Sequence, residues 1–169
     1  MNLRFPLSFI VSIFLIFASS GILTGKEARP PQNTLNLILP FDWLQIEPFA
    51  GGIFAAKDYH NSASVLVVRR ELPEGSEVEA SNREFQTGVI EAVRGRNGRI
   101  IEAGDVKLAN HSAFRIYFKD KGSNLHTLSF TLFDGNIMYG IIFFCMGEDP
   151  SLRYDVQKIL KKAYFRVDA

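Results

Sequence analysis

Hydrophobic and polar residues alternate along four short segments in the first half of the chain, and this period of two is typical of β-strands with one buried face. The segments are residues 35–39, 43–46, 53–58 and 62–71. The last one is apolar on both faces as far as Val68, which predicts a strand in the middle of a sheet. Pro40 has no N–H to donate to a β-ladder, so we expect the break between the first two strands at that residue.

A polar loop then gives way to a helical period. Ser81 and Glu84 have the spacing of a capping box, in which each side chain satisfies a backbone N–H of the first turn. The apolar residues that recur on one face are Phe85, Val89, Ile90 and Val93. These features predict an α-helix from about Ser81 to Arg94, with Gly95 as its stop.

Long strand-like segments dominate the second half of the chain. They cover residues 99–109, 112–120, 125–133 and 136–146. We expect the first to be bulged or bent at Gly104 and the last two to form a hairpin through Asp134 and Gly135, a residue pair favoured in tight β-turns. The second arm of that hairpin is apolar on both faces, so we expect it in the middle of the sheet.

A second helix is predicted near the C-terminal end. Asp149 is a favourable N-cap, and Pro150 suits the first turn because its missing N–H is not needed there. The expected buried stripe consists of Leu152, Val156, Ile159, Leu160 and Ala163. We expect this helix to end near Tyr164.

The N-terminal segment has the pattern of an export signal. Residues 5–25 are mostly apolar and uncharged, they follow the positive Arg4, and small side chains stand at Ala18 and Ser20. This pattern is typical of a Sec-type signal peptide, so we predict a leader at residues 1–20 and a periplasmic or extracellular protein. The alternative is an uncleaved inner-membrane anchor with the domain outside the cytoplasm, since about 20 apolar residues span a bilayer.

After the leader we expect a linker and one domain. Residues 21–33 contain Pro30 and Pro31 and few large apolar side chains near their end, which is typical of an extended linker. Residues 34–166 contain all the predicted strands and helices without an internal repeat. We therefore expect a single α+β domain.

The charge balance restricts the classes of partner. Of the 19 basic residues only Arg4 lies in the predicted leader, so the rest of the chain is formally neutral against 18 acidic residues. Domains that bind nucleic acid usually show a basic excess, so we expect no nucleic-acid partner, and membrane contact only through an uncleaved N-terminal segment. Cys145 is the only cysteine and lies in an apolar run, which excludes an intrachain disulfide and predicts a buried thiol.

The chain lacks the common catalytic motifs: the nucleophile elbow, the HExxH zinc motif, the CxxC pair and the phosphate-binding glycine loop. His60, His111 and His126 are scattered, without the close spacing of metal ligands. We therefore expect no catalytic residue, no metal site and no cofactor. A carboxylate pair that folding brings together stays open as an acid–base site.

A basic group follows the first predicted helix. It consists of Arg94, Arg96 and Arg99. One interpretation is an anion-binding site. The other is that cations favour the negative end of a helix dipole, which already accounts for Arg94 and Arg96.

Several short features have the spacing of a known family. They are Leu39-Pro40 followed by Trp43, the strand Val65 to Val68 followed by Glu71-Leu72-Pro73, the strand Phe114 to Phe118, the Asp134-Gly135 hairpin and the ending ILKKAYFR. From about Thr34 to Arg166 the chain thus resembles the PsbP-like superfamily. That group includes the extrinsic PsbP subunit of photosystem II, a Ran-binding nuclear transport factor, and exported bacterial proteins of the DcrB and LpqN types.

The resemblance implies an α/β/α sandwich, in which a central and mostly antiparallel sheet is flanked by two main helices. It also implies roles in binding and assembly rather than catalysis, and it transfers no functional residue. The rival is a cystatin-like or nuclear-transport-factor-like α+β domain, in which a helix precedes the strands. Four strand candidates precede the first helix here, and this order favours the sandwich.

These observations lead to a functional hypothesis: a non-enzymatic exported module that binds a protein or another component of the cell envelope. Trp43, Phe49, Tyr59 and His60 are the candidate contact residues, as aromatic groups expected near an exposed sheet edge. For Trp43 the favoured interpretation is that it closes one end of the core of the sheet. One alternative is a carrier of a small apolar ligand, since the chain contains 15 phenylalanines. A hydrolase with a spatially assembled acid–base pair is the other. The oligomeric state stays open.

Overall fold

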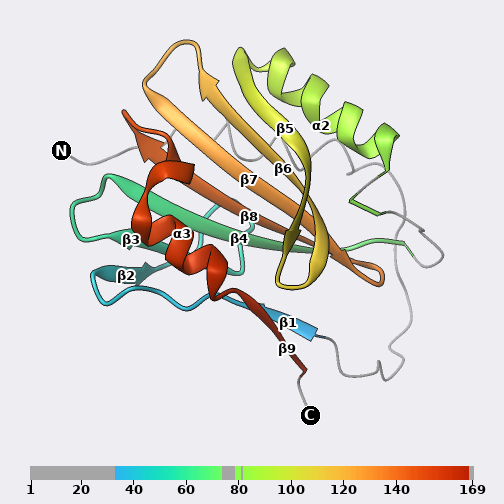
Figure 1. Ribbon diagram of the computed structural model, residues 1–169, viewed down its shortest axis with the longest axis horizontal. Helices are drawn as coiled ribbons and strands as arrows, with labels where there is room; N and C mark the ends of the chain where they lie inside the picture. Colours follow the sequence, from blue (N-terminus) through green and yellow to red (C-terminus); the bar gives the residue numbers. More distant parts are fainter. Residues whose placement is uncertain (1–32, 74–78, 81, 168–169) are drawn as a thin grey trace.

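Seven strands form one antiparallel sheet with helices on both faces in the computed structural model, which describes residues 33–73, 79–80 and 82–167 (Figure 1). The strands are β2 (Trp43–Ile46), β3 (Phe54–Asp58), β4 (Ala63–Glu71), β5 (Gly98–Leu108), β6 (His111–Asp120), β7 (Leu125–Asp134) and β8 (Ile137–Met146). The helices are α2 (Arg83–Gly95), the 3-10 turn η1 (Pro150–Leu152) and α3 (Tyr154–Lys161). Strands β1 (Asn33–Asn36) and β9 (Tyr164–Val167) form a separate antiparallel pair.

The middle of the sheet is β8, because the strand order is β2-β3-β4-β8-β7-β6-β5. Every residue of β8 from Ile137 to Cys145 is buried, as are the first six residues of the neighbouring β4. Both predictions of strands covered on two faces are confirmed. The predicted hairpin also forms, and Gly135 at its tip has φ +58°, a conformation that glycine adopts without a Cβ clash.

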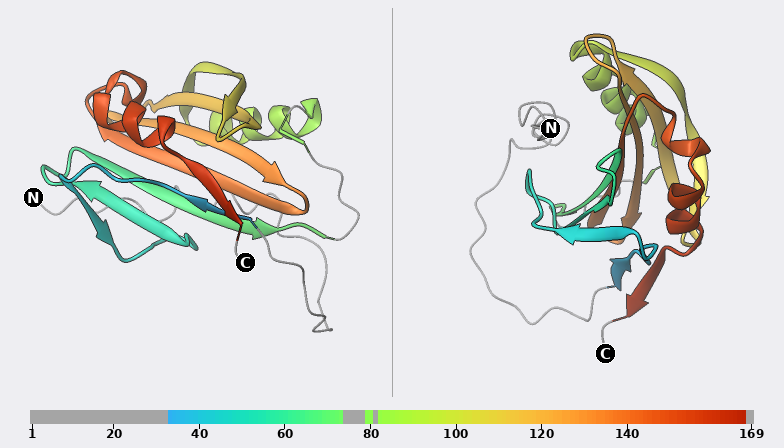
Figure 2. Two further views of the ribbon diagram at one scale, coloured as in Figure 1. Left: turned by 60° about the horizontal axis from the view of Figure 1, so that its bottom comes forward. Right: turned by 90° about the vertical axis from the view of Figure 1, so that its left-hand side faces the viewer.

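Successive side chains of β6 pack in the cores on opposite faces of the sheet. A different helix covers each face (Figure 2). Phe114 and Phe118 pack in one core with Phe85 of α2. Tyr117 belongs to the other core, which Val156 of α3 helps to complete. We call these the α2 face and the α3 face. The predicted sandwich of two main helices around an antiparallel sheet is confirmed.

The first predicted strand, residues 35–39, is wrong in its extent. β1 ends at Asn36 and pairs with β9 rather than with the main sheet. The alternating leucines Leu35, Leu37 and Leu39 nevertheless all pack on the core of the α3 face. Apolar burial therefore explains the alternation beyond the point where the β-ladder stops.

The helix predicted between Asp149 and Tyr164 is interrupted at Arg153. This residue separates η1 from α3 with extended backbone angles, φ −74° and ψ 128°, and Tyr164 already belongs to β9. Leu152, expected in the buried stripe, is 78% exposed. At this break the Arg153 side chain forms ion pairs with Glu148 and Asp155, which are close in sequence, and with the distant Asp58.

Two smaller predictions concern the start of α2 and the course of β5. The N-cap of α2 is Asn82, whose side chain accepts hydrogen bonds from the N–H groups of Glu84 (2.9 Å) and Phe85 (3.2 Å). The proposed cap Ser81 lies outside the described residues.

In β5 the register shift lies between Ile100 and Glu102, so the predicted position of the irregularity, Gly104, is wrong. Gly104 pairs regularly with Arg115 of β6. The shift brings Arg99 and Glu102, which are three positions apart, onto the same side of the sheet.

Across the described residues, no helix has both the length and the hydropathy of a membrane span. The predicted leader and nearly all of the predicted linker lie outside those residues.

Candidate functional site

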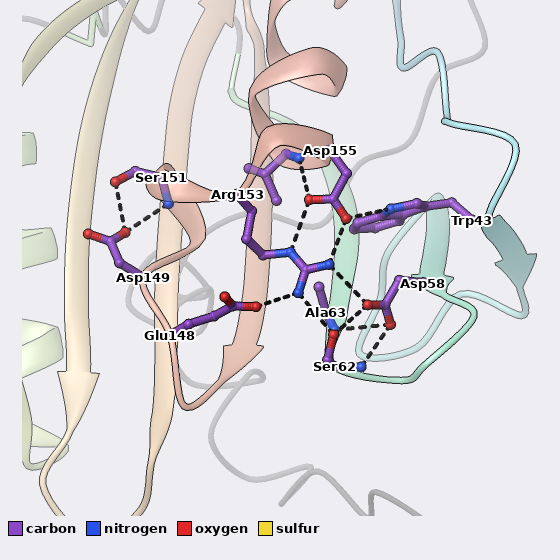
Figure 3. Close-up of polar contacts among 10 residues, drawn as sticks. Trp43, Asp58, Ser62, Ala63, Glu148, Asp149, Ser151, Arg153 and Asp155 are labelled. Carbon is purple, nitrogen blue, oxygen red and sulfur yellow. Dashed lines mark hydrogen bonds and ion pairs between the residues drawn. The ribbon is translucent and has the colours of Figure 1, made fainter.

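Arg153 is the centre of a polar network where the β3–β4 turn meets the start of α3 (Figure 3). Its Nη2 donates to Asp58 Oδ2 (3.0 Å) and to Asp155 Oδ2 (2.7 Å), and its Nε donates to Asp155 Oδ1 (3.0 Å). Its Nη1 donates to Ser62 Oγ (2.9 Å) and to Glu148 Oε1 (2.5 Å). A guanidinium has five N–H groups, so this pattern gives each of them an acceptor.

Asp58 is the most deeply buried carboxylate of the network, and the residue is 3% exposed. It closes the β3–β4 turn by accepting hydrogen bonds from the N–H groups of Ser62 (2.7 Å) and Ala63 (3.2 Å) and from the Ser62 hydroxyl (2.5 Å). Burying an unpaired carboxylate costs several kcal/mol, so a cationic partner is needed here. Arg153 supplies it.

Trp43 connects the edge of the sheet to α3. Its Nε1 donates to Asp155 Oδ2 (3.0 Å) across 112 positions of the sequence. The indole belongs to the core of the α3 face, and in the register of β2 with β3 Trp43 stands directly opposite Asp58. The network therefore fastens three separate segments to one another: β2, the β3–β4 turn and the start of α3.

Electrostatics keep the central pair ionised. Burial raises the pKa of the Asp155 carboxyl, but hydrogen bonds from Arg153 and Trp43 outweigh burial and hold this pKa below its usual range. The hydrogen bond to Asp155 raises the pKa of Arg153 above its already high value, against the opposing effect of burial. The three carboxylates that pair with Arg153 leave the network with an excess of two negative charges.

Four large apolar side chains are exposed next to the members of this network. They are Phe41 (101% exposed), Tyr59 (72%), Leu152 (78%) and Tyr154 (78%), and we call them the apolar rim. Tyr59 follows Asp58 in the chain, and its N–H donates to the carbonyl of Asp42 (2.9 Å), beside Phe41. Leu152 and Tyr154 flank Arg153. Thus, the inward contacts of the network fix the backbone from which the rim projects.

The four residues predicted to make contacts have different environments. Trp43 is 4% exposed and packs in the core, so the interpretation that it closes one end of the core is confirmed and the expectation that it is an exposed aromatic is wrong. Phe49 is half-buried and packs against the α2 face near β4. Tyr59 and His60 are exposed and stack edge to face, with ring centroids 5.5 Å apart. Whether any of them contacts a partner stays a prediction.

Sequence reasoning missed Asp58, Arg153 and Asp155 as a connected set. One signal was present: in the third strand Asp58 has the same parity as the buried Ala56, so a carboxylate was due to face the core. A buried carboxylate needs a cationic side chain close to it in the folded protein. The sequence does not reveal which cation, because Arg153 fits equally well on the outer face of a continuous helix.

A second polar group lies on the same face, in β6 and β7. Tyr117 Oη and His126 Nδ1 are hydrogen-bonded at 2.6 Å, and their rings are stacked. Burial, followed by the charge of Lys119, lowers the pKa of His126, and burial raises the pKa of Tyr117. Both groups are therefore uncharged at neutral pH.

Cys145 stands directly opposite His126 across β7 and β8, an arrangement that invites comparison with a cysteine–histidine dyad. However, Cys145 is 1% exposed, and burial raises the pKa of its thiol to about 12. Nucleophilic cysteines need the opposite shift. The geometry therefore supports the predicted buried thiol and gives no nucleophile.

Within the described residues, no group of three or more histidine, cysteine or acidic side chains has the arrangement of a metal site. His111 lies on β6 with its Nδ1 2.9 Å from the carbonyl oxygen of Ala109 and its ring against Phe165. His60 and His126 lie on the β3–β4 turn and on β7, respectively.

Comparisons with known proteins place the fold. No protein-family model and no curated protein matches this sequence. The crystal structure of LpqN, involved in cell envelope biogenesis of Mycobacterium tuberculosis, is similar with a TM-score of 0.61 and 9% identity over 81% of this chain and 86% of that one. The solution structure of CyanoP, the cyanobacterial PsbP of Synechocystis sp. PCC 6803, is similar with a TM-score of 0.52 and 14% identity over 88% and 98%. The chain has a PsbP-like fold, and the predicted resemblance is confirmed at that level.

Proposed function

We propose that this protein is a non-enzymatic exported module that binds a protein partner of the cell envelope through the apolar rim. One observation carries the proposal. Four large apolar side chains project into solvent from segments that the Arg153 network holds in place. Isolated exposed apolar residues are common on protein surfaces, but a group on a fixed backbone is a favourable contact surface.

The physical properties of the rim suit protein recognition. Tyrosine supplies a large contact area with few rotatable bonds, and it is enriched among residues that dominate interface energies. A surface that is already ordered loses little conformational entropy on binding. The excess negative charge of the network, including the half-exposed Glu148, favours a partner with basic side chains around an apolar patch.

The same network argues against catalysis at this place. All five N–H groups of Arg153 are committed to internal acceptors, and Asp58 accepts four hydrogen bonds from protein groups. Neither group retains the free donor or basic lone pair that a substrate needs. The network therefore has a structural role, because it holds β2, the β3–β4 turn and the start of α3 together.

The predicted leader and the fold shared with LpqN support an address in the cell envelope. LpqN is involved in envelope biogenesis, and the present chain begins with the features of a Sec-type signal. We assign the partner to the same compartment, outside the cytoplasm.

The experiment compares capture of envelope proteins by the full-length wild type and by two variants. Tyr59→Ala/Tyr154→Ala removes two rim aromatics, whereas Ile101→Ala removes an exposed apolar side chain (47% exposed) on the far edge strand β5. We expect one partner to be retained by the wild type and by Ile101→Ala, and to bind the double variant at least about tenfold more weakly, as for loss of interface hot spots. Equal capture by all three proteins, or turnover by the wild type in a broad hydrolase screen, would contradict the proposal.

A further inference from the structure

At the edge of the sheet opposite to β2, three cations surround a small hollow. A recess with a volume of 270 Å³ is lined by Arg99 of β5, Lys119 of β6 and Lys121 of the β6–β7 turn, together with Asp120. Lys121 N donates to the carbonyl of Asn97 (3.2 Å), so the turn is tied to the start of β5. We call these three side chains the cation recess.

The strand register makes this arrangement unfavourable in the absence of an anion. Arg99 and Lys119 stand directly opposite each other in β5 and β6, and like charges in that position destabilise a sheet. The next residue in the same cross-strand row is His126, opposite Lys119. Burial and then Lys119 lower the pKa of His126, so the imidazole is neutral and adds no further positive charge to the row.

The nearby acceptors do not neutralise the three cations. Asp120 is committed to its own turn, where it accepts hydrogen bonds from Gly122 N (3.1 Å) and Ser123 Oγ (2.8 Å). Lys119 donates to the neutral amide oxygen of Asn124 (2.8 Å). Among the described residues, neither Arg99 nor Lys121 forms an ion pair.

A neighbouring cation on the same two strands has a carboxylate partner, which is the usual arrangement. Arg115 of β6 forms an ion pair with Glu102 of β5 on the same face of the sheet. Positive charge on this face is therefore compensated at one position and left uncompensated a few residues away. The contrast indicates that the cation recess is open to an anion from outside the chain.

We propose that the cation recess binds a phosphate group, either of a small soluble phosphate or of a lipid headgroup. Phosphate offers several strong acceptor oxygens, so three donors on different segments can bind it at once, with arginine in a planar fork and lysine as a point charge. The volume lies just below the range of about 300–1,000 Å³ typical of pockets for drug-sized ligands, which suits a headgroup. The site shares no residue with the apolar rim, so it stands or falls independently of the proposed partner surface.

The first test measures binding of inorganic phosphate and of glycerol 3-phosphate to the full-length protein by calorimetry, at an ionic strength held constant with sodium chloride. The test variant is Arg99→Gln/Lys121→Gln. Its charge-matched control is Lys161→Gln/Lys162→Gln at the exposed end of α3. We expect the test variant to bind at least tenfold more weakly and the control to stay within twofold of the wild type.

His126 provides a readout that a loss of folding cannot mimic. The groups that act on its charge are Lys119, Arg99 and Asp149, and Tyr117 is its hydrogen-bond partner. An anion in the cation recess favours the protonated imidazole, so saturating phosphate should raise the pKa of His126 in an NMR titration of the wild type and the control. The pKa should not respond to phosphate in Arg99→Gln/Lys121→Gln.

Vesicles separate the two sources of phosphate. Binding to phosphatidylcholine vesicles containing phosphatidic acid, and not to phosphatidylcholine alone, with loss in the test variant, assigns a lipid headgroup. Binding of the soluble phosphates without vesicle binding assigns a soluble ligand. The proposal is overturned if the wild type binds none of these probes, or if the test variant and the control are affected equally.

Discussion

The Arg153 network and the cation recess lie on the same face of one sheet, but they differ in how their charged groups are paired. In the network, one guanidinium is shared by three carboxylates, and each of its N–H groups has an acceptor. In the recess, three cations surround one carboxylate that its own turn already uses. In the network, every N–H donor of Arg153 has an acceptor within the protein. In the recess, the cations have enough negatively charged partners only when an anion is added.

Burial explains why the chain tolerates both. Asp58 is nearly inaccessible to water, so its charge must be paired inside the protein. Arg99 and Lys121 are exposed, so water and salt screen their repulsion and the cost is small. Pairing in the buried region thus maintains the structure, while unpaired charge in the open region is available for function.

Replacing Arg153 with methionine should have the largest effect. The change leaves Asp58 and Asp155 without their cation, and we expect the free energy of unfolding in urea to fall by about 3–5 kcal/mol. Glu148→Gln is the control: because Glu148 is half-exposed, its loss should cost at most about 1 kcal/mol.

Should Arg153→Met not fold, the double variant Asp58→Asn/Arg153→Met provides the decisive measurement. Asparagine retains an acceptor for the β3–β4 turn without a buried charge, so this variant should recover part of the lost stability. If it is no more stable than the single variant, the charge of Asp58 is not what requires Arg153.

Trp43→Phe should cost about 1.5–3 kcal/mol in the same urea experiment, because it removes a hydrogen bond to the ionised Asp155 while keeping an aromatic ring in the core. The matched cycle uses Asp155→Ala. In that background the cost of Trp43→Phe should be clearly smaller, since the acceptor is gone. Equal costs in both backgrounds would show that packing of the indole, and not the bond, links β2 to α3.

Lowering the pH should reduce the stability that the Arg153 network contributes, because Asp155 takes up a proton. The groups of the cation recess should not contribute to this loss. The pKa of Asp155 is lower in the folded protein than its unfolded value of about 3.9, so the unfolded chain takes up the proton first. The stabilisation is complete above that unfolded value and is lost as the pH falls through the folded pKa. We expect the urea midpoint to decline below about pH 4 in the wild type and more gently in Asp155→Asn. Indistinguishable pH profiles would remove Asp155 as the acid-sensitive group.

Lys119→Gln should give the smallest effect and the opposite sign. Removing one of two like charges that face each other across β5 and β6 should stabilise the protein by about 0.2–1 kcal/mol in phosphate-free buffer. The gain should shrink in phosphate, which stabilises only the wild-type recess. Lys161→Gln serves as control and should change stability little. A destabilised Lys119→Gln would mean that the bond to Asn124 outweighs the repulsion.

The sheet was predictable because its signals are local. The apolar run of β8, the two covered faces of β4 and the turn at Gly135 each follow from neighbouring residues. The pairing of β1 with β9 was not predictable, because backbone hydrogen bonds join the two ends of the domain without a side-chain pattern. The burial of Leu35 was predicted correctly, but its pairing with Phe165 of β9 could not be predicted.

The two polar regions were harder to predict from the sequence, because their residues are far apart in the chain. Arg153 follows Leu152, whose spacing fits a helical stripe, and its ion pair with the distant Asp58 leaves no trace in the local sequence pattern. Arg99 was noticed within a basic group, but Lys119 becomes its neighbour only through the β5–β6 register. In both cases charged groups far apart in sequence define the site, and local periodicity carries no information about them.

The pairing of β1 with β9 has a consequence for the timing of folding. Strand β1 can complete its hydrogen bonds only with β9, which is synthesised after all the strands of the main sheet. Contacts that close so long a loop form late and slowly. A chain that emerges N-terminus first therefore keeps β1 without its partner strand until β9 has been synthesised.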